Sequence, residues 1–109
     1  MTTAEVATMI ESIDVPFAYY QFPNNTEQKT PFICFYYPDG NDFVADGTNY
    51  VHVNRLIIEL YTDNKNFTLE DTVKSTLSSN GLVYVWDSTY LEDEHMYMTT
   101  FTTEVLIDG

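Results

Sequence analysis

The chain is poor in cysteine and in positive charge. Cys34 is its single cysteine, which excludes an internal disulfide and a cysteine-based zinc cluster. Four Lys and Arg side chains stand against 17 Asp and Glu, so the net charge is −13. Because nucleic acids and anionic lipid surfaces are bound through Lys and Arg, we expect neither sequence-specific nucleic-acid binding nor membrane binding.

Long apolar runs are missing as well. No run approaches the roughly 18 residues that can cross a bilayer. The first residues lack the basic and apolar regions of a signal peptide, so we expect the chain to be made in the cytoplasm.

Recognised catalytic motifs are absent. The sequence has no P-loop, no dinucleotide fingerprint, no G-x-S-x-G elbow and no H-E-x-x-H motif. His52 has no sequence neighbour that would orient a general base, and the apolar surroundings of Cys34 favour an inert thiol. The acidic run Glu92–His95 lacks the spacing of a metal-binding loop. We predict no catalytic residue, no cofactor and no metal, with an unrecognised enzyme site as an open alternative.

The residues that are present predict one folded domain over residues 1–109. Hydrophobic residues make up 44% of the chain, and no repeat or linker-like segment divides it. A chain of this size removes roughly 60 to 70% of its surface from water when it folds. One hydrophobic core is therefore sufficient.

Two amphipathic helices are predicted. The first covers residues 3–13, where apolar residues recur at helical spacing, and Thr2 or Thr3 can cap it. The second begins with a capping-box pattern of Thr68 and Asp71 and ends at an Asn-Gly pair. Both helices carry one apolar stripe, which must pack against another layer.

Runs rich in aromatic and β-branched residues predict the strands. In the longest run Leu56, Ile58 and Leu60 share one face, which we assign to the core. The order of elements favours an α+β fold: an antiparallel sheet of four to six strands with two helices packed on one face. The predicted strands cover residues 17–22, 32–37, 43–45, 50–62, 82–90 and 96–107.

Aromatic residues are unusually numerous, with nine tyrosines and seven phenylalanines. Neighbours in a strand point to opposite faces, so some of these rings must lie away from the core. Tyrosine is enriched at protein interfaces, which favours contact with partners. The alternative is that other parts of the same chain cover these rings.

Several short segments occur in an order that resembles the tail completion, or tail terminator, proteins of long non-contractile-tailed phages and prophages of Gram-positive bacteria. The resemblance extends over nearly the whole chain. The segments are Pro16-Phe17-Ala18-Tyr19-Tyr20, Pro31-Phe32-Ile33, Asn41-Asp42-Phe43-Val44-Ala45-Asp46, Tyr50, Ile58-Glu59-Leu60-Tyr61-Thr62-Asp63 with Lys65, and Glu94-His95-Met96-Tyr97.

The resemblance implies a structural virion protein that caps the head-proximal end of the tail tube and joins it to the head connector. It implies a homo-oligomeric ring, commonly a hexamer, whose partners are the major tail tube protein and head-tail connector proteins. The location would be the tail or neck of the virion, and the host cytoplasm during assembly. No catalytic residue or cofactor is implied.

A closed ring needs two different patches that meet head to tail. We predict that the loop of residues 38–49 and the loop of residues 23–30 contact neighbouring subunits or the tail tube protein. The predicted interface residues are Tyr37, Asp42, Phe43, Asp46 and Tyr50.

Two other functions remain open at this point. One is another neck or minor capsid component, such as a head-tail stopper. The other is an acidic inhibitor or nucleic-acid mimic that binds a basic protein. Such mimics space carboxylates regularly over one surface, whereas many of the acidic residues here fall in predicted turns.

Overall fold

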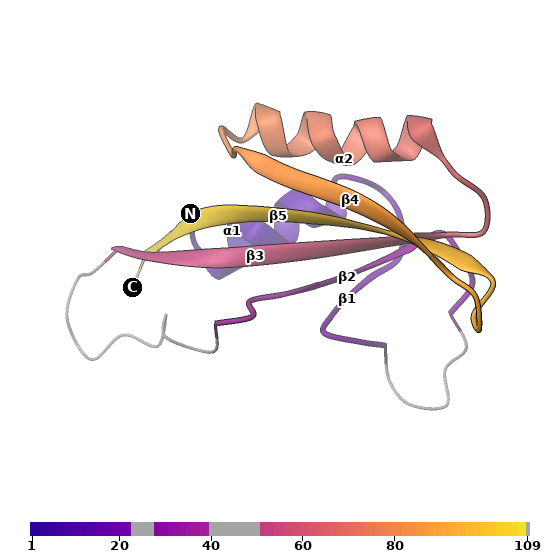
Figure 1. The fold of residues 1–109 in the computed structure, drawn as a ribbon. Coiled ribbons are helices and arrows are strands. Elements are labelled where there is room, and N and C mark those ends of the chain that lie inside the picture. Colours follow the sequence, from indigo (N-terminus) through magenta and orange to yellow (C-terminus); the bar gives the residue numbers. More distant parts are fainter. Residues whose placement is uncertain (23–27, 40–50, 109) are drawn as a thin grey trace.

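Two helices pack on one face of a five-stranded sheet in the computed structural model of this chain (Figure 1). The structure describes residues 1–22, 28–39 and 51–108. The predicted α+β fold class is confirmed. In chain order the elements are α1 (Thr3–Glu11), β1 (Phe17–Tyr19), β2 (Phe32–Tyr36), β3 (Val51–Thr62), α2 (Phe67–Ser79), β4 (Tyr84–Leu91) and β5 (Met96–Asp108).

The sheet is built around β3 and β5. Its strand order is β1-β2-β3-β5-β4, and β3 pairs antiparallel with β5 along its whole length, from Val51 opposite Asp108 to Thr62 opposite Tyr97. The β2–β3 and β4–β5 pairs are also antiparallel, as predicted. The β1–β2 pair is parallel and departs from the antiparallel arrangement predicted for the sheet; parallel neighbours need a connection of about a dozen residues or more, which the sequence between them supplies.

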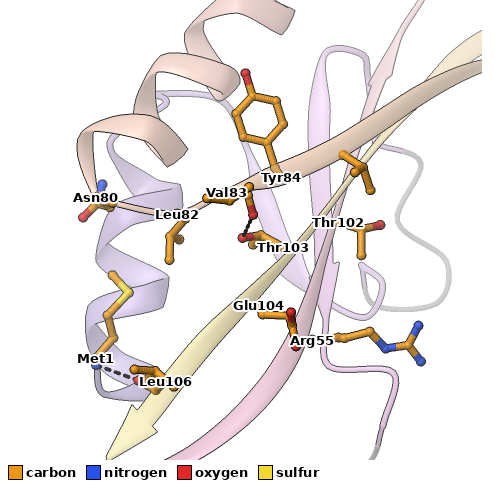
Figure 2. Close-up of a pocket in the computed structure, with 12 residues that line it drawn as sticks. Met1, Arg55, Asn80, Leu82, Val83, Tyr84, Thr102, Thr103, Glu104 and Leu106 are labelled. Carbon is orange, nitrogen blue, oxygen red and sulfur yellow. Dashed lines mark hydrogen bonds between the residues drawn. The ribbon is translucent and has the colours of Figure 1, made fainter.

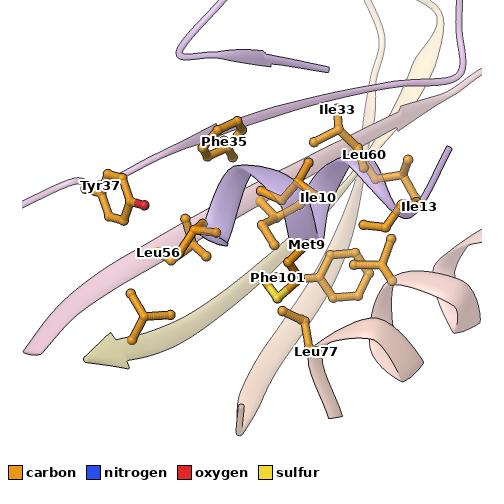
Figure 3. Close-up of a cluster of buried hydrophobic side chains, with 14 of the residues drawn as sticks. Met9, Ile10, Ile13, Ile33, Phe35, Tyr37, Leu56, Leu60, Leu77 and Phe101 are labelled. Carbon is orange, nitrogen blue, oxygen red and sulfur yellow. The ribbon is translucent and has the colours of Figure 1, made fainter. Parts of the chain in front are cut away.

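One face of the sheet and the two helices form the core. Ile33 of β2, Ile58 of β3 and Phe101 of β5 point to this face, and Leu56, Ile58 and Leu60 are completely buried, as predicted. Figure 3 shows α1 and α2 contributing to the same cluster. The helix residues in it are Val6, Met9, Ile10, Val73 and Leu77, and Ile13 joins them from just beyond α1, which ends at Glu11 and is shorter than predicted.

The two helix starts differ in how well the sequence predicts them. Thr2 caps α1 in a capping box with Glu5, as predicted. The predicted Thr68 cap of α2 is wrong, since Asn66 is the cap and its Oδ1 accepts a hydrogen bond of 3.0 Å from the Leu69 amide. Asparagine is among the strongest capping residues, so it starts the helix earlier. At the other end Gly81 has a φ of 74°, which suits the predicted Asn-Gly stop.

The first strand is shorter than predicted. It ends at Tyr19, because Tyr20 has a φ of 67° in the left-handed region and leaves the extended conformation. The predicted strand at residues 43–45 lies outside the described residues. The same holds for the predicted turns at residues 40–47 and for most of the loop of residues 23–30.

Candidate interaction surface

The sheet face opposite the helices is the candidate interaction surface, called here the open face. Side chains alternate along each strand, so the residues between the core positions of β2 and β3 point to it. Both helices belong to the cluster on the other face. On β2 and the second half of β3 the open-face residues are Phe32, Cys34, Tyr36, Ile57, Glu59 and Tyr61.

Glu59 lies at the centre of the open face. It sits on the middle strand, opposite Cys34 of β2 and Thr100 of β5. The Tyr61 hydroxyl donates to its Oε1 at 2.8 Å, and the Tyr36 hydroxyl donates to its Oε2 at 3.1 Å. Each carboxylate oxygen therefore has one tyrosine donor, which fixes the plane of the carboxylate.

Each of these two tyrosines is stacked on a second ring. Tyr20 lies on Tyr36 with ring centroids 5.4 Å apart, and Phe32 lies on Tyr61 at 4.7 Å. The planes within each pair differ by 17°. These four rings, called here the aromatic clasp, stand on two sides of Glu59. The predicted placement of some rings away from the core is confirmed.

The surroundings of Glu59 change the acidity of its neighbours. Burial and the nearby Glu59 carboxylate raise the pKa of Tyr61 and of Tyr36, because a phenolate there would lose hydration and meet a like charge. Burial, together with Glu59, also raises the pKa of the Cys34 thiol. The thiol is therefore protonated at neutral pH, which agrees with the expectation of an inert cysteine.

We expect the folded chain to lose stability in alkaline solution. When folding raises a tyrosine pKa, the stabilisation is complete below the ordinary value of about 10 and disappears as the pH rises through the folded value. Burial raises the pKa of Tyr37 to about 12. The urea midpoint should therefore fall between about pH 10 and about pH 12. The Tyr61→Phe variant lacks one of the tyrosines whose pKa is raised, so its urea midpoint should fall less than that of the unmodified chain. An equal fall in the two proteins would contradict a contribution from Tyr61.

The open face ends in a groove beside β5. Pairing with β4 stops at Tyr84 opposite Thr103, while β5 continues to Asp108 with β3 as its one strand partner among the described residues. The groove has a volume of about 820 Å³. The Met1 ammonium donates to the Leu106 carbonyl along this stretch, at a distance of 2.7 Å (Figure 2). Leu106 is 55% exposed, and other apolar side chains exposed nearby are Val53, Val83 and Val85.

The positive side chains of the chain are mostly engaged within it. Lys29 is exposed and has no ion-pair partner among the described residues. The other three contact residues of the same chain. Arg55 donates to both carboxylate oxygens of Asp39, at 2.8 and 2.9 Å, and Lys65 donates to Glu70 at 2.6 Å. The Lys74 ammonium lies 3.7 Å from the centroid of the Trp86 ring. The surface therefore offers carboxylates to a partner much more than cations.

Of the predicted interface residues, only Tyr37 falls within the described residues. Its side chain is 3% exposed and belongs to the core cluster, with its ring centroid 6.0 Å from that of Tyr19. Within one copy of the chain, Tyr37 is thus covered. Asp42, Phe43, Asp46 and Tyr50 lie outside the described residues, so their role stays a prediction.

The acidic run of residues 92–95 lies in a turn at the protein surface. Glu92, Asp93, Glu94 and His95 are exposed in the turn between β4 and β5. Across residues 1–22, 28–39 and 51–108, no three His, Cys, Asp or Glu side chains gather in a way that could hold a metal ion. No helix in this part of the chain is long and apolar enough to cross a membrane.

We find no family model and no curated protein that matches the chain. The fold is similar to a chain in the solved structure of the virion of a native gene transfer agent particle, with a TM-score of 0.55 and 14% sequence identity. The match covers 94% of this chain and 86% of that chain. At this identity the likeness shows a shared fold.

Proposed function

We propose that the chain is a structural protein of a phage-like virion. The observation that carries the proposal is the fold likeness to a chain of a gene transfer agent virion, which extends over 94% of this chain. The sequence resemblance to phage tail completion proteins arises independently and leads to the same class of particle. Proteins of this kind act through assembly, and the proposal includes no catalytic residue and no cofactor.

The finer proposal is that the chain is a tail terminator. It forms a homo-oligomeric ring, a hexamer in the virion, at the head-proximal end of the tail tube, and joins the tube to the head connector. The ordered segments that resemble tail completion proteins support this position. The net charge of −13 is compatible with a ring through which DNA passes, because an anionic wall does not retain phosphates.

One described surface of the chain supports head-to-tail contact between subunits. The groove beside β5 exposes Leu106, and β4 does not pair with the end of β5 here, where the Met1 ammonium caps the Leu106 carbonyl; sheet edges of this kind readily pair with another chain. The loop of residues 38–49, with Asp42, Phe43, Asp46 and Tyr50, remains the proposed second patch, and Tyr37 adjoins it with its ring covered by the same chain. A ring requires two such unlike patches.

Electron microscopy of the purified chain mixed with tail tubes of its own particle tests this function. We expect one ring at one end of each tube, and tubes that stop growing when the chain is added. The Phe43→Ala variant should cap fewer tubes. Phe67→Ala serves as its control, because it removes an exposed ring at the start of α2 instead. Tubes that stay bare and keep growing would contradict the tail-terminator role.

The anionic surface favours a second candidate function, an acidic inhibitor or nucleic-acid mimic that binds a basic protein. Its support is the net charge of −13 together with the internal engagement of Arg55, Lys65 and Lys74. A head-tail stopper is the nearest alternative within the virion. It would bind the isolated head connector and leave tube ends bare, whereas a mimic would bind a basic nuclease in a strongly salt-dependent manner.

A further inference from the structure

Glu59 and the aromatic clasp form a preorganised anionic site on the open face. A carboxylate can accept about four hydrogen bonds, and the two tyrosine hydroxyls use only one position on each oxygen. Across the described residues, no Lys, Arg or His lies within ion-pair distance of Glu59. The carboxylate is thus held in place by its own chain but is not neutralised by it.

We propose that this site binds an arginine side chain of a partner protein. The proposal deepens the proposed function by giving the chemistry of the partner, and it rests on that function only in taking the partner to be a protein. It concerns Glu59 together with Tyr20, Phe32, Tyr36 and Tyr61.

The geometry favours arginine over lysine. A guanidinium is planar, presents its N–H groups as a fork to a carboxylate, and stacks on aromatic faces. The site offers both features, a carboxylate of fixed orientation and tyrosine rings on two sides of it. A lysine ammonium would find the charge but could use neither the plane of the carboxylate nor the stacking surface.

The arginine has to come from outside this chain. Arg55 is the only arginine in the sequence, and both oxygens of Asp39 hold it. A second copy could offer only the same engaged side chain and would bring another net charge of −13. A basic partner, in contrast, is attracted by the whole field of this chain before it reaches the site.

Chemical-shift titration of the folded chain with N-acetyl-arginine amide tests the proposal. The expected shifts are concentrated at the backbone amides of residues 34–36 and 57–61. The neutral citrulline analogue should bind about tenfold more weakly, because the charge-assisted hydrogen bonds are lost. The lysine analogue should bind at least about threefold more weakly, since it cannot stack.

Two matched variants assign the effect to Glu59. Glu59→Gln should weaken arginine binding about tenfold. Glu104→Gln removes one negative charge from the same open face, where Glu104 lies opposite Arg55. This variant should change the affinity for arginine by less than about twofold. Tyr61→Phe, which keeps the ring but removes one donor, should weaken binding as well. It provides the test if Glu59→Gln does not fold.

Several results would overturn the proposal. Equal losses in Glu59→Gln and Glu104→Gln would show general charge attraction, as would shifts confined to the acidic turn of residues 92–94. Equal affinity for the arginine and lysine analogues would show that the aromatic clasp does not stack on the guanidinium. Self-association that Arg55→Gln abolishes would make a second copy the occupant. The tube-capping assay is separate, so arginine binding without capping would refute the tail-terminator role while leaving this site in place.

Discussion

Replacing Lys65 with methionine should lower the free energy of unfolding by about 3 kcal/mol, because it leaves a buried carboxylate without its cation. The Glu70 side chain is 2% exposed, and its Oε2 lies 2.6 Å from the Lys65 ammonium. That ammonium also donates to the Ser88 hydroxyl at 2.8 Å, which ties α2 to β4. Without Lys65, the Glu70 carboxylate is still buried away from water but no longer has a positive charge to offset the lost hydration.

Urea denaturation of three variants measures this effect. The double variant Lys65→Met/Glu70→Leu should recover most of the loss, because a buried ion pair can often be replaced by apolar residues at little cost. Lys74→Met is the matched control. Its ammonium lies over the Trp86 ring, a contact worth about 1 kcal/mol. Equal losses for Lys65→Met and Lys74→Met would show that the buried pair has no special role.

The second large effect is expected at Phe101, whose replacement by alanine should cost about 3 to 5 kcal/mol. Its side chain is completely buried on the helix face of the sheet, opposite Ile58 of β3 and Trp86 of β4. The Tyr84 ring packs edge-on to it at 6.3 Å. Removing the ring therefore opens a cavity where the helices meet the sheet.

Thermal and urea unfolding of Phe101→Ala check this prediction. Leu106→Ala provides the comparison on the same strand, because Leu106 is on the open face and 55% exposed. It should lose less than about 1 kcal/mol. If Phe101→Ala also lost less than about 1 kcal/mol, the core would not centre on β5.

Periodicity along the chain was sufficient to predict the main elements. The alternation of Leu56, Ile58 and Leu60 identified the core face of β3, since a strand has only two faces. The α1 stripe and the stop at Gly81 follow from equally local rules. The sequence could not predict that β1 runs parallel to β2, because the direction of pairing depends on the path of the connection and not on the residues in the strands.

The candidate site depended on long-range register, which local patterns do not contain. Tyr36 and Glu59 are far apart in the sequence, and only the β2–β3 register brings the hydroxyl to the carboxylate. The surplus of tyrosines was the one signal that predicted rings away from the core. Tyr37 shows the limit of that signal, because its ring belongs to the core while that of its neighbour Tyr36 lies on the open face.

Disrupting the gene for this chain in the particle that encodes it tests the central claim most directly. A tail terminator stops the tube and joins it to the head, so its loss should leave complete heads beside unattached tails of irregular and excessive length. Supplying the intact chain should restore joined particles of normal tail length. Normal, joined and infectious particles in the absence of the chain would contradict the proposed function.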